Sequence, residues 1–289
     1  MIVQTTIIKA IPDHLASGAM EFLESMPHPG VVSKAIRYGD IIVVVRGSQS
    51  LEQDIIKRIL EVYQKPPFIR RQYVFSKSEV EQAKMLAIGS DTAPLDEVET
   101  EFVRTDQTCR RCLSGSRVVS AHIRGPRKPK QHFMQTIQHD MIISADTARL
   151  LLEAGCPSSD LVPARWRGED DQFYLISPER TVPRMSPQSE GVFVDEDHPC
   201  AVCNRRFSGL LTVPQLLRYD RAFLESLDKD ECRFYWSWEY FGAWLEPENL
   251  NPQFASVGRP KLLATKKCCK ILRAHCKRQV EAIPVFPDA

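Results

Sequence analysis

Two Cys-x-x-Cys pairs constrain the fold of this 289-residue chain more than any other feature. They are Cys109-Arg-Arg-Cys112 and Cys200-Ala-Val-Cys203. A tight turn that presents two thiols is the usual half-site of a tetrahedral zinc ion, and two such turns complete a four-sulfur shell with no open position. The pairs therefore predict one structural Zn²⁺ centre, whose ligands are Cys109, Cys112, Cys200 and Cys203.

Two other interpretations of these cysteines stay open. Reduced cysteines can have this spacing without a metal, and His198, close to the second pair, could replace one thiol. A thioredoxin-type redox pair is disfavoured, because it expects its motif where a strand enters a helix. The remaining cysteines lack half-site spacing and are predicted to be buried core thiols: Cys156, Cys232, Cys268, Cys269 and Cys276.

Composition and charge narrow the class of protein. The formal net charge is +1, so any argument for a nucleic-acid or membrane partner must come from a local cluster. No apolar run approaches the ~18 residues of a membrane span, and residues 1–6 lack the pattern of a signal peptide. We therefore expect a cytoplasmic protein with no membrane partner. In the reducing cytoplasm, Cys-x-x-Cys pairs bind metal sooner than they form disulfides.

The first ninety residues alternate between strand and helix patterns. Strands are predicted over 2–8, 31–38, 41–46 and 68–75, and amphipathic helices over 13–26 and 50–63. The order βαββαβ predicts a ferredoxin-like module at 1–90, with a hairpin turn at Gly39-Asp40. Its central strand carries no aromatic residue on which a base could stack, so a scaffold or dimerisation role is favoured over RNA binding. A capping box at Ser76 and Glu79 predicts a further helix that continues to Leu86.

The rest of the chain, 91–289, is predicted to be a zinc-stabilised α+β domain with two CxxC-containing repeats, at about 105–165 and 195–289. In each repeat a strand runs into a Ser- or Thr-capped helix and ends in an extended segment with proline. The correspondence holds at one constant offset and indicates a duplication. The matched pairs are Ser144 with Thr265, Ala148 with Cys269, Leu151 with Leu272, and Pro163 with Pro284.

Two local features are candidates for partner binding. An aromatic segment over 234–244 holds three of the four tryptophans, and such residues either fill a core or anchor an interface. A basic segment over 259–278 holds eight Lys or Arg and no acidic residue, which suits a phosphate backbone, an acidic partner or an ordinary exposed helix face. The candidate contact residues are Trp236, Trp238, Tyr240, Trp244, Lys266, Lys267 and Lys270.

The sequence contains no recognised catalytic motif. A phosphate-binding loop, GxGxxG after a strand, GxSxG and HExxH are all absent. The segment 199–203 matches half of the zinc-deaminase signature, but no His-x-Glu precedes it. We therefore expect a protein that is not an enzyme.

The pattern as a whole resembles the double-CxxC(G) immunity proteins of myxobacterial and related toxin–immunity loci. The features that carry this resemblance are the two cysteine pairs, the strand and capped helix after each, and the aromatic segment 238–242. They cover roughly 70–289. The family pattern has Gly after each second cysteine, where this chain has Leu113 and Asn204. Asn tolerates the left-handed backbone that Gly would supply, whereas Leu does so poorly.

The resemblance implies a non-catalytic, zinc-stabilised binding protein that neutralises a partner protein, possibly a toxin. The alternative is a nucleic-acid-binding zinc-ribbon protein of a mobile-element or defence system. Salt-dependent affinity for DNA or RNA that is lost on charge reversal at Lys266, Lys267 and Lys270 would favour the alternative.

Overall fold

A computed structural model of the chain divides into two compact units, one formed mainly by residues 1–76 and the other by 77–210 and 216–289. The structure describes residues 2–10, 21, 24–25, 31–37, 40–46, 49–63, 67–90, 98–103, 108–110, 115, 117–124, 128–136, 140–166, 169–190, 192–194, 200–204, 207–210, 216–241 and 259–288. The sheets and helices have the mixed α+β character that the sequence predicts. No helix within these described ranges is both long and apolar enough to span a bilayer.

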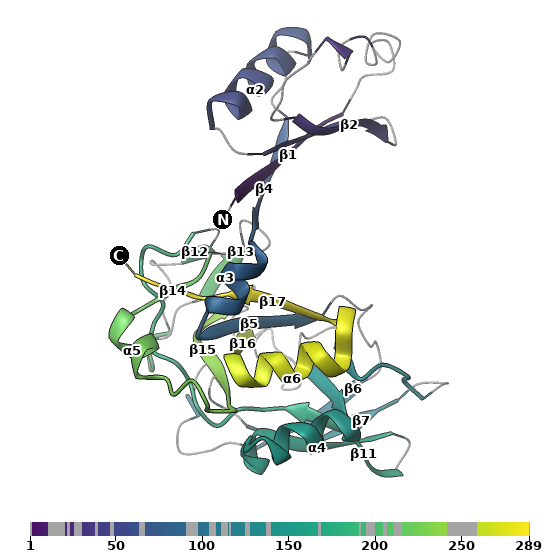
Figure 1. Cartoon of the computed structure of the whole chain (residues 1–289), viewed down its shortest axis with the longest axis vertical. Coiled ribbons are helices and arrows are strands. Elements are labelled where there is room, and N and C mark those ends of the chain that lie inside the picture. Colours follow the sequence, from purple (N-terminus) through teal and green to yellow (C-terminus); the bar gives the residue numbers. More distant parts are fainter. Residues whose placement is uncertain are drawn as a thin grey trace. The chain divides into compact units, whose positions relative to one another are not determined.

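The first unit is a four-stranded antiparallel sheet in the order β2-β3-β1-β4, with helix α2 between β3 and β4 in the sequence (Figure 1). Alternate residues of β3 face the core, which also contains Ile7 and the apolar side of α2. The predicted hairpin between β2 and β3 is confirmed, but the turn predicted at Gly39-Asp40 is wrong by one residue, because Asp40 already pairs with Arg37. The predicted helix at 13–26 lies largely outside the described residues. The elements are β1 (Ile2–Ala10), β2 (Val31–Arg37), β3 (Asp40–Arg46), α2 (Gln49–Tyr63) and β4 (Phe68–Val74).

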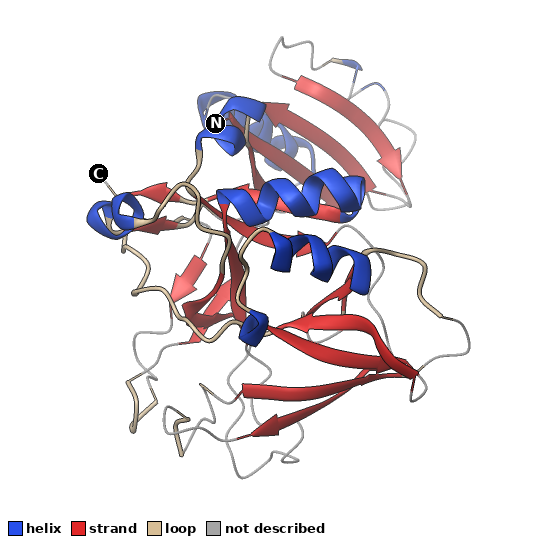
Figure 2. Cartoon of the chain, turned by 60° about the horizontal axis from the view of Figure 1, so that its bottom comes forward, coloured by secondary structure: helices blue, strands red, loops and turns tan. Residues whose placement is uncertain are grey.

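The second unit contains two six-stranded sheets (Figure 2). The first has the order β6-β7-β10-β11-β9-β8 and the second β12-β13-β15-β16-β5-β17. The strands of the first sheet are β6 (Val98–Val103), β7 (Arg117–Ile123), β8 (Phe133–Gln135), β9 (Met141–Ser144), β10 (Leu161–Trp166) and β11 (Glu169–Ile176). The strands of the second are β5 (Met85–Ser90), β12 (Val192–Val194), β13 (Phe207–Leu210), β15 (Phe234–Phe241), β16 (Arg259–Thr265) and β17 (Val280–Pro284).

Helices α4 and α6 contact each other, and each contacts strands of its own sheet. The largest hydrophobic core is shared by these elements, with Leu151 and Leu272 both fully buried. Leucine at these two positions fits the apolar stripe that an amphipathic helix turns toward a core. The remaining elements of this unit are α3 (Lys77–Gln82), α4 (Ala145–Glu153), β14 (Arg218–Tyr219), α5 (Arg221–Ser226), α6 (Lys266–Cys276) and β18 (Phe286–Pro287).

Two βαβ segments of this unit have the same topology. In β9-α4-β10 the two strands each pair antiparallel with β11, which lies between them. In β16-α6-β17 the two strands each pair antiparallel with β5, which takes the same place. The buried positions of the helices also correspond at the offset found in the sequence: Thr147 with Cys268, Ala148 with Cys269, and Leu151 with Leu272.

Strand β5 changes the domain boundary predicted at residue 90. Helix α3 ends at Gln82, and the four residues from Met85 to Ile88 continue as a buried strand instead of a helix. This strand pairs with β16 and β17 and so belongs to the second unit. Its partners come from the far end of the chain, a long-range pairing that local propensity does not encode.

Candidate metal centre and basic groove

Three of the four predicted metal ligands converge. The Sγ atoms of Cys109, Cys200 and Cys203 all lie within 4.8 Å of one another, and those of Cys109 and Cys200 are 3.7 Å apart. A tetrahedral zinc site with Zn–S bonds of ~2.3 Å has sulfur–sulfur edges of about 3.8 Å. Cys109 and Cys200 are buried and Cys203 is half-buried. This group can hold a metal ion; the fourth predicted ligand, Cys112, lies outside the described residues.

The turn at Cys200–Cys203 is closed by a backbone hydrogen bond and followed by a left-handed residue. The Asn204 backbone N–H donates to the carbonyl of Cys200 at 2.8 Å, which closes the turn. Asn204 has a φ of 54°, in the left-handed region that Asn adopts more readily than most residues. The residue after the second cysteine therefore takes a conformation that Gly adopts without strain. The corresponding Leu113 lies outside the described residues.

Tyr240 connects the two cysteine loops. It is buried against Cys109, Cys200 and Cys203, and its hydroxyl accepts a 3.1 Å hydrogen bond from the backbone N–H of Gly115. The parallel pairing of β13 with β15 sets Phe207 opposite Tyr240 and so brings the strand after the second turn to this ring. We predicted Tyr240 as a partner contact, but at 7% exposure it supports the cysteine cluster instead. Nothing in its local sequence distinguishes the two roles.

Trp236 and Trp238, the two tryptophans of β15, are half-buried. Trp236 packs against the main core, and the Arg184 guanidinium lies 4.1 Å from the ring centroid of Trp238. These contacts restrict both rings, so neither is a fully open anchor for a partner. Trp244 and His198 lie outside the described residues.

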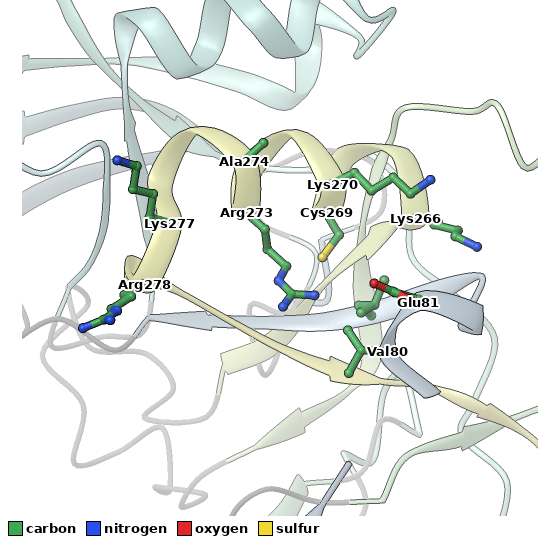
Figure 3. A pocket seen from close by; sticks show the side chains of 10 residues that line it. Val80, Glu81, Lys266, Cys269, Lys270, Arg273, Ala274, Lys277 and Arg278 are labelled. Atoms are coloured by element: carbon green, nitrogen blue, oxygen red, sulfur yellow. The ribbon is translucent and has the colours of Figure 1, made fainter. Parts of the chain in front are cut away.

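A basic groove lies between α3 and α6, with a cavity volume of about 740 Å³ (Figure 3). Arg273 points from α6 toward α3, with Lys266 and Lys270 at one end of the groove and Lys277 and Arg278 at the other. Four of these cations recur at i, i+4, i+7 and i+11, the spacing of one helix face. The apolar part of the lining comprises Val80, Leu86, Cys269 and Ala274.

The cations of this groove outnumber the acidic side chains that line it. Among the described lining residues Glu81 is the one acid, and its carboxylate lies 3.6 Å from the ammonium of Lys77, a residue that does not line the groove. Lys266 begins α6, a helix with no acidic residue in its first turn, although the positive end of the helix dipole disfavours cations there. An anionic ligand would relieve both effects.

The three predicted lysine contacts differ in their positions. Lys266 and Lys270 line the groove, whereas the Lys267 ammonium donates to the carbonyl of Ala154 at 2.8 Å. That carbonyl belongs to the residue that caps the C-terminus of α4, so Lys267 joins the two helices. Arg273 and Lys277 also line the groove and were not among the predicted contacts, although the sequence places them at helical spacing from Lys266 and Lys270.

Comparisons with known proteins provide no independent assignment. No family model matches the chain, and no curated protein or solved structure matches it significantly.

Proposed function

We propose that this protein is a non-catalytic binding protein, stabilised by a structural zinc ion and recognising an acidic partner protein through the α3–α6 groove. The observation that carries the proposal is the convergence of Cys109, Cys200 and Cys203 from distant parts of the chain. Cys112 completes the proposed shell. Four thiolates leave no position for a substrate or an activated water, and such closed sites are structural.

The chemistry of the groove favours a protein partner over nucleic acid. Five cations surround a floor that is partly apolar, which suits carboxylates on a backbone with apolar side chains. Among the described lining residues there is no aromatic ring, and single-stranded nucleic acids are commonly bound by stacking on such rings. The resemblance to immunity proteins extends the proposal to a toxin as the partner. For the first unit we propose the ferredoxin-like fold, which the strand order β2-β3-β1-β4 supports.

Metal analysis of the purified chain tests the zinc centre. We expect about one zinc per chain, and its loss from Cys200→Ala. Structural zinc contributes ~10–16 kcal/mol in peptide models, and a loss of even ~5 kcal/mol would lower the melting temperature by roughly 10–20 °C. Cys269→Ala is the matched control, because Cys269 is equally buried but belongs to α6. Full zinc content in Cys200→Ala, or unchanged melting after chelation, would contradict a structural zinc.

Binding titrations test the groove separately. The probes are labelled poly-glutamate, a DNA duplex and single-stranded RNA, each at several salt concentrations. We expect poly-glutamate to bind, and the double variant Lys270→Glu, Arg273→Glu to reduce its affinity at least about tenfold, the effect of ~1.4 kcal/mol. The control variant Lys57→Glu, Lys229→Glu makes the same change in net charge at exposed sites outside the groove. Tighter nucleic-acid binding that is lost in the groove variant alone would favour the alternative function.

A further inference from the structure

A second group of cysteines lies in the main core, away from the proposed zinc ligands. Cys156, Cys232 and Cys268 are 4%, 3% and 0% exposed and come from three different segments. Cys156 follows α4, Cys232 precedes β15, and Cys268 lies in the first turn of α6. Their burial agrees with the expectation from the sequence, but no spacing pattern predicted that they would meet.

The Sγ atoms of Cys232 and Cys268 are 2.8 Å apart. This is much closer than the 3.7 Å between Cys109 and Cys200, which fits the edge of a zinc tetrahedron. It is also below the ~3.6 Å of ordinary sulfur–sulfur van der Waals contact, and within about 0.8 Å of a disulfide bond. The two cysteine clusters thus differ in their sulfur–sulfur distances. The distance between Cys232 and Cys268 is that of two sulfurs close to bond formation.

Three hydrogen bonds of Thr265, two of them made by its hydroxyl, hold the segments that carry this cysteine pair. The Thr265 hydroxyl donates to the carbonyl of Glu231 at 2.7 Å and accepts from the N–H of Arg233 at 3.1 Å. The Thr265 N–H donates to the carbonyl of Arg233 at 3.0 Å. These bonds fix Cys232 beside the start of α6, where Cys268 lies three residues beyond Thr265.

The electrostatics of the group favour one thiolate. Hydrogen bonds from Cys156 and Cys268, together with the charge of Lys267, lower the pKa of Cys232 well below its ordinary value. Burial raises the pKa of Cys268, which therefore stays a thiol. A thiolate next to a thiol is the pair that disulfide chemistry requires.

We propose that Cys232 and Cys268 are a modification site, at which a small peroxide converts the two thiols to a disulfide. The Cys232 thiolate attacks one oxygen of hydrogen peroxide and breaks the O–O bond, giving a sulfenic acid and hydroxide, which takes up a proton to become water. The Cys268 thiol then loses its proton and attacks the Cys232 sulfur, which releases the second water. Two thiols are oxidised and one peroxide is reduced to two waters. Burial selects an oxidant of this size over bulky disulfides.

Peptide mapping of the full zinc-loaded chain tests the proposal. The reduced chain is treated with hydrogen peroxide, quenched with catalase, denatured with N-ethylmaleimide and digested with trypsin. We expect residues 230–233 to be joined to residues 268–270, and both peptides to carry maleimide before oxidation. Because the second peptide also contains Cys269, fragmentation between Cys268 and Cys269 assigns the bridge in the unmodified sequence.

Two matched variants complete the test. Cys269→Ala should keep the cross-link at the wild-type yield, and Cys268→Ala should abolish it; both positions are buried in the same turn of α6. Circular dichroism checks that each variant folds, and the wild-type fragmentation result stands even if one does not. Three results would overturn the proposal: maleimide on Cys232 and Cys268 after oxidation, a bridge to Cys269, or a second zinc per chain that Cys232→Ala removes.

Discussion

The segments β9-α4-β10 and β16-α6-β17 share one topology but differ in the electrostatics of their helices. Helix α4 is balanced from within: the Ser144 hydroxyl accepts from the N–H of Thr147, Asp146 lies in the first turn, and Arg149 pairs with Glu153 at 3.1 Å. Helix α6 has no acidic residue in its first turn, and the Thr265 hydroxyl bonds Glu231 and Arg233, in the loop before β15, instead of capping the helix. The charges of α4 are thus paired within its own segment, whereas those of α6 are left for the ligand that we propose.

Truncation of the corresponding leucines should have the largest effect and tests whether the two segments carry equal structural roles. Leu151→Ala and Leu272→Ala each remove a fully buried side chain from the same core. We expect each to lower the free energy of unfolding by about 2–5 kcal/mol, measured by denaturant titration. Leu152→Ala, at an exposed leucine of α4, should cost far less. A small loss at one buried leucine alone would show that the segments are not equivalent.

The stability should depend on pH through Lys261 of β16, whereas the corresponding strand β9 carries no ionisable side chain. Burial lowers the pKa of Lys261 in β16 to about 8, an effect partly opposed by Glu281. Between pH ~8 and ~10.5 the unfolded chain binds the proton more tightly, so the stability rises with pH through this window. Lys261 is half-buried, and we expect a contribution of about 1–2 kcal/mol after solvent screening.

The variant Lys261→Met should be more stable than the wild-type chain at pH 7 and should lose most of this rise. Thermal melts over the pH range measure the difference, with the exposed Lys270→Met as the control. Parallel pH profiles for the wild-type chain and Lys261→Met would refute a lowered pKa at Lys261.

Charge exchange at the helix starts should give the smallest effect. Lys266→Glu puts an acid at the positive end of α6 and should raise the stability by about 0.3–1 kcal/mol, while it weakens binding of poly-glutamate. Asp146→Lys makes the opposite change in α4 and should lower the stability by a similar amount without affecting binding. If Lys266→Glu lowered the stability instead, the cation at the start of α6 would not destabilise the helix, and the proposed trade of stability for ligand recognition would be wrong.

The sequence predicted the local features of this molecule best. The Ser144 cap of α4 and the hairpin that joins β2 and β3 follow from short patterns whose physical causes lie within a few residues. The predicted Thr265 cap of α6 is wrong, because its hydroxyl bonds Glu231 and Arg233 instead. The convergence of the three cysteines joins distant segments and was predicted from the ligand chemistry of zinc. Contacts between distant segments were less accessible. The pairing of β5, the burial of Tyr240 beside the cysteines and the approach of Cys232 to Cys268 depend on tertiary packing, which no local spacing encodes.

The position of β5 has a consequence for how the chain is made. About 170 residues separate the end of this apolar strand from the start of β16, so during synthesis β5 is translated well before both of the strands that pair with it. Until they leave the ribosome, two unpaired edges of Met-Leu-Ala-Ile are open to other nascent chains. Expression from a message truncated before β16 should therefore give aggregates, and chaperones that shield exposed strands should raise the yield of the full-length protein.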